Sequence, residues 1–227
     1  MNGILCLMSS EVNSQPNTKR PYDRSRRQAA AEQTRRAIIE ASRALLLTNG
    51  YTATTMPAIA AAAGVAVDTV YTVLGPKPKV FRLLVELAIS GEDKPIPAEE
   101  RDYVQAIHRE PDPHRKIELY ARAVAVIQPR LAPLFRVLQE AARSEPGLAD
   151  LWNEISQRRA ANMRRFVSEV ANAAGGLPRG MTIGDAADLV WATNGPEFYT
   201  MLIEERGWDI EHLERHLVQL WTHWLIP

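Results

Sequence analysis

Six consecutive residues, Val-Asp-Thr-Val-Tyr-Thr at 67–72, place a carboxylate, two hydroxyls and a phenol within two helical turns. The hydroxyls of Thr69 and Thr72 can donate or accept hydrogen bonds, and Val67 can contact a thymine methyl group. Asp68 can accept from the amino group of cytosine. It would also lie in the first turn of a helix, where the helix dipole favours a carboxylate, and that is the simpler explanation of it. The segment therefore has the chemistry of base readout, with one residue that helix stability also explains.

Basic residues lie on either side of this segment but are absent from it. Affinity for a polyanion and readout of its sequence are separable, because phosphate contacts need only cations and helix N-termini. Arg35 and Arg36 precede the segment, and Lys77 and Lys79 follow it. Thr55 is a plausible N-cap for a short upstream helix. Our candidates for phosphate contacts are these five residues and the upstream basic residues Arg24, Arg26 and Arg27.

The net charge of zero conceals two oppositely charged parts of the 227-residue chain. Residues 1–82 carry 11 Lys/Arg and 5 Asp/Glu, a net charge of +6, and residues 83–227 carry a net charge of −6. A basic first third suggests that this part meets a polyanion such as double-stranded DNA. A chance difference in surface charge is the alternative.

Other function classes find little support. His212 and His216 could share a helix face, but their spacing lacks the His-Glu-x-x-His order and no third ligand is apparent. Cys6 is the single cysteine, so there is neither a disulfide framework nor a thiolate metal site. No catalytic constellation or glycine-rich phosphate loop is apparent. We therefore expect no metal, no cofactor and no enzymatic activity.

The chain also lacks membrane and export signals. No run of about 18 apolar residues occurs. The apolar start, MNGILCLM, has no basic flank, which argues against a signal peptide. We expect no membrane association and a cytoplasmic location.

The candidate segment must be positioned by helices. From Ala29 apolar residues recur at helical spacing until Asn49-Gly50, a typical helix end. Gly64 separates two short helices expected at about 56–63 and 67–73, and a longer helix should run from Lys77 to Ile89. Two short helices around a glycine, packed on a longer one, indicate a helix-turn-helix unit. Further helices are expected near 98–108, 113–127, 130–144, 148–173, 184–205 and 209–225.

Residues 38–81 resemble the DNA-binding domain of the tetracycline-repressor (TetR) family. The resemblance is carried by a set of spaced positions, namely Ala41, Leu45, Gly50, Tyr51, Thr54, Thr55, Ile59, Ala60, Ala63, Gly64, Val65, Thr69, Tyr71, Lys77 and Phe81. The family's plan of an N-terminal helix-turn-helix and a helical ligand-binding, dimerising domain fits the rest of the chain in length and helicity.

The resemblance implies a homodimeric repressor whose helix Val67–Val73 enters the major groove of a palindromic operator and leaves it when a small molecule binds. It places Thr55, Tyr71 and Lys77 at positions that contact the DNA backbone, and residues 67–69 and 72 opposite the bases. An activator would need the same DNA-binding head. Ala66 departs from the family, which often has Ser there, so the recognition helix lacks a side-chain N-cap.

We therefore predict an all-α fold with a disordered basic arm at 1–27, a helix-turn-helix domain at 28–91, and a larger helical ligand-binding and dimerisation domain at 98–227. Large apolar or polar residues that could contact a hydrophobic or aromatic effector are Leu87, at the end of the helix-turn-helix domain, and His108, Tyr120, Phe135, Trp152 and Phe166 of the last domain. At helical spacing such residues are more often plain core than ligand contacts.

The last two long helices are the expected dimer interface. Their large apolar residues are Trp191, Phe198, Leu202, Leu213, Leu217, Trp221 and Trp224. The alternative is that they close the core of the monomer. An alternative function is a helical small-molecule or protein-binding module with a degenerate DNA-binding head.

Overall fold

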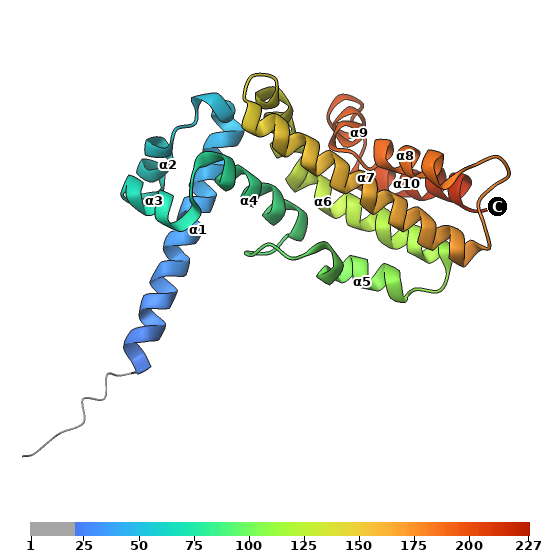
Figure 1. Cartoon of the computed structure of the whole chain (residues 1–227), viewed down its shortest axis with the longest axis horizontal. Coiled ribbons are helices and arrows are strands. Elements are labelled where there is room, and N and C mark those ends of the chain that lie inside the picture. The colour runs from blue at the N-terminus through green and yellow to red at the C-terminus, as the bar shows by residue number, and fades with distance from the viewer. Residues whose placement is uncertain (1–20) are drawn as a thin grey trace, which may run out of the picture.

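The computed structural model describes residues 21–227, which fold into helices without any strand (Figure 1). This confirms the predicted all-α class. The helices are α1 (Pro21–Ala53), α2 (Met56–Ala63), α3 (Val67–Leu74), α4 (Lys77–Ser90), α5 (Asp102–Arg109), α6 (Pro113–Ala142), α7 (Pro146–Ala174), α8 (Ile183–Thr193), α9 (Pro196–Thr200) and α10 (Ile210–Leu225). A 3₁₀ turn (Ala98–Glu100) precedes α5, and one π turn (Met201–Glu205) follows α9.

Helix α1 begins earlier than expected. It starts at Pro21, so residues 21–27 are helical and the prediction that they belong to a disordered arm is wrong. A proline at the first helical position is preorganised for a helix, and arginine, glutamine and alanine favour its continuation. Figure 1 shows this end of α1 extending away from the other helices. The predicted arm at residues 1–20 lies outside the described residues. At the other end, Gly50 interrupts the helix with φ 74°, as the Asn49-Gly50 signal predicts.

Helices α2 and α3 form the expected helix-turn-helix, with a bend of 100° between them. The Thr55 hydroxyl caps α2 by accepting from the Ala58 N–H at 3.2 Å. Gly64 makes the turn in the left-handed conformation, at φ 69°. Helix α3 has no side-chain cap at Ala66, as predicted, and is held by burial of Val70 and Leu74. A small core joins the unit to α1 and α4 and consists of Ile38, Met56, Ile59, Ala60, Val70, Leu74 and Val80.

Helix α6 is continuous, so the predicted break at Pro129 is wrong. Pro129 and Pro133 both lie inside the helix. A proline inside a helix removes a hydrogen bond at a cost of about 3 kcal/mol. Helix α6 nevertheless buries residues along its whole length, and Tyr120 and Phe135 belong to two different cores. This tertiary packing outweighs the local preference of proline.

The predicted helix 184–205 is divided in two. Helix α8 ends at Thr193, and α9 begins after Asn194 and Gly195 at Pro196. A Cβ atom at Gly195 would lie 2.8 Å from the Glu197 carboxylate and 3.2 Å from the Arg159 guanidinium, so a larger residue here would displace these two side chains. The Asn-Gly-Pro sequence was a break signal that the periodicity obscured.

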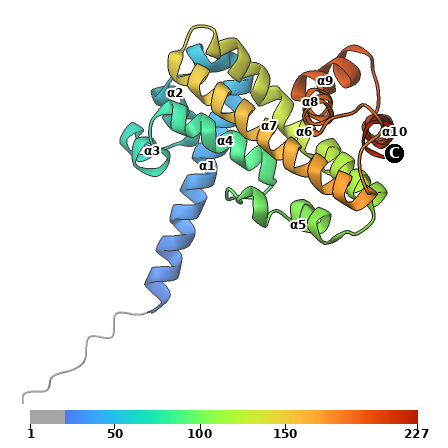
Figure 2. The same cartoon turned by 45° about the vertical axis from the view of Figure 1, so that its right-hand side comes forward.

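The N-terminal head and the C-terminal helices share a hydrophobic core. Leu46 of α1 and Phe81 and Leu84 of α4 pack with Leu134 and Phe135 of α6. Figure 2 shows α4 lying between the head and the long pair α6 and α7. A second core lies at the far end, among α5 to α8 and α10. Within residues 21–227 no single helix is long and apolar enough to cross a membrane, and α2 and α3 reach that apolarity only as a sharply bent pair.

Candidate DNA-contacting surface and internal cavity

Helix α3 presents the predicted base-reading residues on its outer face. Asp68, Tyr71 and Thr72 are exposed, with 49% of the Tyr71 surface accessible, and Val67 and Thr69 are half-buried. The Thr72 hydroxyl donates to the Asp68 backbone carbonyl at 2.8 Å. Its proton is therefore used inside the helix, and the side chain offers an acceptor and a methyl group to the outside.

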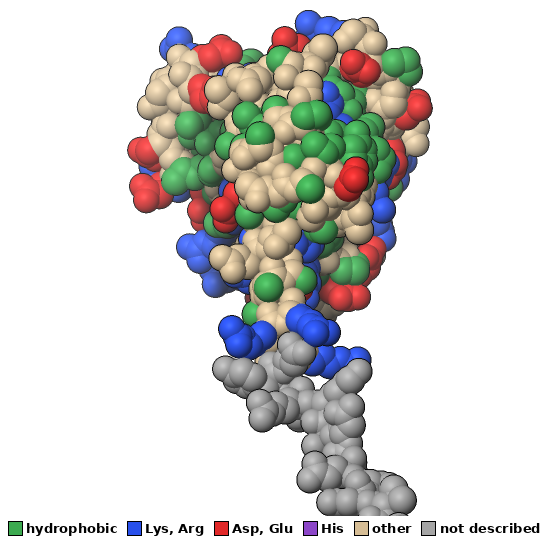
Figure 3. Space-filling view, turned by 90° about the vertical axis from the view of Figure 1, so that its left-hand side faces the viewer, with side chains coloured by type: hydrophobic (Ala, Val, Ile, Leu, Met, Phe, Trp, Pro, Cys, Tyr) green, Lys and Arg blue, Asp and Glu red, His purple; other side chains and the backbone are tan. Residues whose placement is uncertain are grey.

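The side of the molecule that presents α2 and α3 is largely uncharged at its centre. Figure 3 shows Lys and Arg side chains gathering instead at the lower edge, where α1 leaves the body. This arrangement agrees with the expectation from the sequence that uncharged residues read the bases while cations elsewhere bind the phosphates.

Lys77 does not point outward. Its ammonium donates to the backbone carbonyls of Tyr51 at 2.6 Å and Thr54 at 2.7 Å, and lies 3.9 Å from the centre of the Tyr51 ring. Burial lowers the pKa of Lys77, and the charge of Glu145 opposes that shift. The structure thus gives Lys77 the role of tying the α1–α2 turn to α4, and does not support the predicted phosphate contact.

Arg35 and Arg36 face the loop after α4. Arg35 donates to the Asp93 backbone carbonyl at 3.0 Å, and Arg36 forms an ion pair with the Asp93 carboxylate at 2.6 Å. Both side chains of this ion pair are largely exposed, so the predicted phosphate contacts of Arg35 and Arg36 stay predictions. Lys79 is exposed and has no acidic partner among the residues that the structure describes, and Thr55 lies at the N-terminus of α2.

A cavity of about 560 Å³ lies between three helices (α4, α6 and α7) and the segment that contains α5 and the loop before it. Of the six predicted ligand-binding residues, it is lined by four, which are His108, Tyr120, Phe135 and Phe166. Leu87 is buried elsewhere, and Trp152 packs edge-on against Phe135 with ring centres 5.6 Å apart. These two predictions are wrong, because helical spacing alone does not show which face of a helix meets the cavity.

Four polar residues meet at the cavity, and Asn194 connects them; only Tyr120 was predicted from the sequence. Its side-chain amide donates to the Tyr120 hydroxyl at 2.6 Å, and its side-chain oxygen accepts from Arg159 at 2.8 Å. The side-chain amide of Gln128 donates to the backbone carbonyl of Asn194 at 2.5 Å. All four residues line the cavity. They come from three distant parts of the chain, so no local pattern could reveal them.

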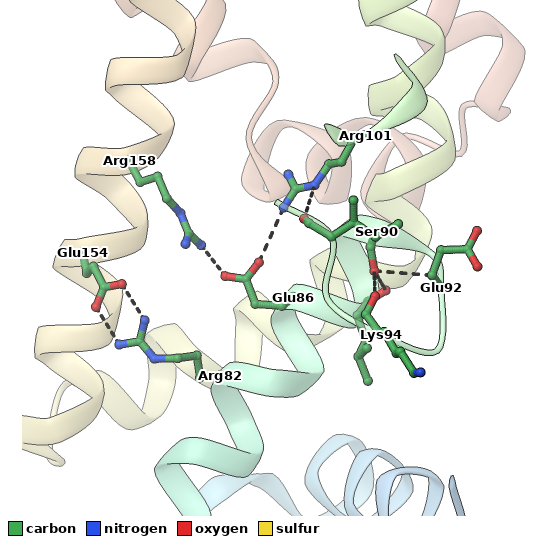
Figure 4. Close-up of polar contacts among 10 residues, drawn as sticks. Arg82, Glu86, Ser90, Glu92, Lys94, Arg101, Glu154 and Arg158 are labelled. Carbon is green, nitrogen blue, oxygen red and sulfur yellow. Dashed lines mark hydrogen bonds and ion pairs between the residues drawn. The ribbon is translucent and has the colours of Figure 1, made fainter. Parts of the chain in front are cut away.

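At the rim of the cavity, α4 is tied to its neighbours by ion pairs (Figure 4). The Glu86 carboxylate accepts from Arg158 of α7 at 2.6 Å and lies 3.5 Å from Arg101 before α5. One turn earlier, Arg82 binds both oxygens of Glu154 on α7, at 2.5 and 2.6 Å. The hydrogen bonds from Arg82 lower the pKa of Glu154. Glu86, Arg101 and Arg158 all line the cavity.

Three of the predicted dimer residues belong to the monomer's own core. Leu213, Leu217 and Trp221 are at most 1% exposed, and the Trp221 indole donates to Thr193 at 2.8 Å. Their assignment to an interface is wrong, because α10 turns its most regular apolar face inward. The other four, Trp191, Phe198, Leu202 and Trp224, are half-buried.

The head and its turn form a helix-turn-helix unit. Residues 38–72 match the family model of the bacterial regulatory proteins of the tetR family. The family resemblance seen in the sequence is thereby confirmed: this segment is the TetR-type DNA-binding unit. No curated protein sequence matches the chain.

Solved structures of regulators share the fold of the whole chain. NalD, the secondary repressor of the MexAB-OprM multidrug efflux pump in Pseudomonas aeruginosa, superposes with a TM-score of 0.67 at 23% identity, covering 87% of this chain and 98% of NalD. The fatty acid degradation regulator FadR from Bacillus halodurans has a TM-score of 0.62 at 19% identity, covering 83% of this chain and 94% of FadR. The chain therefore has the same fold as these two regulators.

Proposed function

We propose that the chain is a ligand-responsive repressor that binds a palindromic operator as a homodimer and leaves it when a small molecule enters the cavity. The observation that carries this proposal is the position of α4. Val80 of α4 packs in the head, close to α3, and Glu86 of the same helix lines the cavity. A ligand that shifts Glu86 would therefore move the helix on which the head is mounted.

The ion pairs of Glu86 make this coupling specific. Arg158 and Arg101 both contact the carboxylate, and both residues line the same cavity. A ligand that competes for either arginine changes the restraint on α4. Differential contacts of this kind are what a ligand needs to shift an equilibrium between two conformations.

For DNA docking, α3 would lie in the major groove with Val67, Asp68, Thr69 and Thr72 toward the bases and Tyr71 toward the backbone. The exposure of this face supports the docking. Cations from Lys79 and from the N-terminal part of α1, together with the N-terminus of α2, would supply phosphate contacts.

For dimerisation, the half-buried residues Trp191, Phe198, Leu202 and Trp224 would meet the same residues of a second copy. Leu189 of α8, 36% exposed, and Met201, 48% exposed, extend this apolar surface. A two-fold axis here would present two copies of α3 to the half-sites of a palindrome.

The test is selection of genomic DNA fragments by the purified protein, followed by sequencing of the bound pool. We expect a palindrome with two half-sites one helical turn or a multiple of it apart, and transcription from the adjoining promoter should fall when the protein is added. The double variant Val67→Ala/Thr69→Ala should change the recovered sequence. Weak, salt-sensitive binding without a consensus would contradict the proposal and favour a binding module whose DNA head has degenerated.

A further inference from the structure

Gln128 presents an unused hydrogen-bond acceptor at the cavity. The residue is only 4% exposed. Its Nε2 donates to the Asn194 backbone carbonyl, which fixes the orientation of the amide because a carbonyl can only accept. Its Oε1 then has no hydrogen-bond donor among the residues that the structure describes. A buried amide oxygen without a donor is unfavourable, so a ligand that brings an N–H or O–H group gains affinity there.

Arg159 presents unused hydrogen-bond donors beside it, although its guanidinium lies 4.9 Å from the centre of the Trp191 ring and the charge of Glu197 acts on it. The acidic residues of the cavity wall each have a basic partner: Glu86 with Arg158, Glu99 with Arg165, and Glu169 with His108. Arg159 has no carboxylate within ion-pair distance in the described part of the chain. It uses Nη2 to donate to the Trp191 carbonyl at 3.1 Å and to Asn194 at 2.8 Å. Its Nε and Nη1 groups have no acceptor among residues 24–227, so they can bind an anion.

Asn194 brings these two groups to one place. Its backbone carbonyl holds Gln128, and its side-chain oxygen holds Arg159. A single ligand head can therefore meet both, provided that it carries an anion and a hydrogen-bond donor on neighbouring atoms. The adjacent wall is aromatic, with the rings of Tyr120 and Phe166 centred 4.5 Å apart and Tyr103 stacked 6.5 Å from Tyr120.

We propose that the cavity binds a small aromatic carboxylic acid with an amino group beside the carboxylate. The carboxylate would meet Arg159, the amine would donate to Gln128 Oε1, and the ring would lie against Tyr120 and Phe166. An amine suits this position better than a hydroxyl. The amine can donate one N–H to the neighbouring carboxylate and still has a second N–H to donate to Gln128 Oε1, whereas a hydroxyl has only one proton to donate. This inference rests on the proposed function, in which the acid is the effector, and narrows the hydrophobic or aromatic ligand expected from the sequence.

The test compares 2-aminobenzoate with 2-methylbenzoate, which has nearly the same shape but no donor, by isothermal titration calorimetry on the full chain. We expect 2-aminobenzoate to bind about tenfold more tightly, because it satisfies Gln128. Gln128→Met should reduce this preference to about one. Arg159→Gln should weaken both acids by about tenfold to a hundredfold. Gln157→Met, on the same helix as Arg159 but exposed and outside the cavity, should leave both affinities unchanged.

The preference between the two acids is the decisive readout, because a general loss of folding would weaken both equally. Equal affinities in the unchanged protein, or a preference that survives Gln128→Met, would overturn the proposal. A neutral fluorescent probe, N-phenyl-1-naphthylamine, separates the two levels of inference. If it binds and 2-aminobenzoate does not displace it, the ligand class is wrong while a ligand-responsive regulator stands. If the acid binds as expected but never releases operator DNA, the site stands and the proposed function fails.

Discussion

The recognition helix and the cavity place their polar residues in opposite ways. In α3 the candidate residues are neighbours in sequence and lie on one eight-residue helix, where each is exposed or half-buried. At the cavity, Tyr120 and Asn194 are 74 residues apart and meet in a buried hydrogen bond of 2.6 Å. A pattern that one helix completes can be read locally, whereas a polar cluster assembled from three distant parts of the chain cannot.

The cations differ between the two regions as well. In the head, Lys77, Arg35 and Arg36 all bind backbone or side-chain oxygens of the protein itself. At the cavity, Arg159 keeps donors that the protein does not use. The position of a cation, and not the charge of its region, therefore indicates whether it serves the fold or a ligand.

Removal of Trp221 should have the largest effect on stability, and it tests whether this face of α10 belongs to the core of the monomer. Trp221 is fully buried, so Trp221→Ala should lower the free energy of unfolding by about 3–5 kcal/mol, measured by urea denaturation. Trp224→Ala, on the half-exposed face of the same helix, should cost distinctly less. Equal losses would show that both residues have the same environment.

Lys77→Met tests whether this cation serves the fold. Loss of the charged donor to two backbone carbonyls should lower the free energy of unfolding by about 1.5–3 kcal/mol. Lys79→Met, two residues along the same helix, should change it by less than about 0.5 kcal/mol. The salt dependence of DNA binding should not change with Lys77→Met. If Lys77→Met instead reduced the slope of log affinity against log salt concentration by about one, Lys77 would contact a phosphate.

Tyr71→Ala sharpens the contrast from the side of the recognition helix. The exposed side chain contributes little to folding, so stability should stay within about 0.5 kcal/mol. Binding to DNA should weaken about tenfold and equally for all sequences, measured by fluorescence anisotropy. Tyr71→Phe isolates the hydroxyl. Discrimination lost at a single base pair would assign Tyr71 to base readout.

The smallest effect is expected at the ion pair between α4 and α7. Arg82 lowers the pKa of Glu154, so this pair stabilises the fold above the usual carboxyl pKa of 4.5 and loses its contribution as the pH falls through the lowered value. Both partners are about half exposed, and Glu154→Gln should cost about 0.2–1 kcal/mol at neutral pH. The difference in unfolding free energy should vanish in acid. Glu140→Gln, an exposed carboxylate on α6, is the control.

Much of the head was predictable because its signals are local. Thr55 caps α2, Gly64 makes the turn and Gly50 ends the regular part of α1, each through the conformational preference of one residue. The failures in the C-terminal domain arose where packing overrode such preferences, as at Pro129. The docking of α3 on DNA and the interface at Trp224 stay predictions.

The sequence by itself determined that the chain is helical, where the recognition helix lies and which residues it offers outward, because periodicity, caps and turns act over a few residues. Only the tertiary structure decided that Lys77 and Trp221 serve the fold, and that Gln128, Arg159 and Asn194 meet at a cavity. The physical reason is that burial and hydrogen bonding depend on which distant helices pack together, and these contacts leave no trace in the local order of residues.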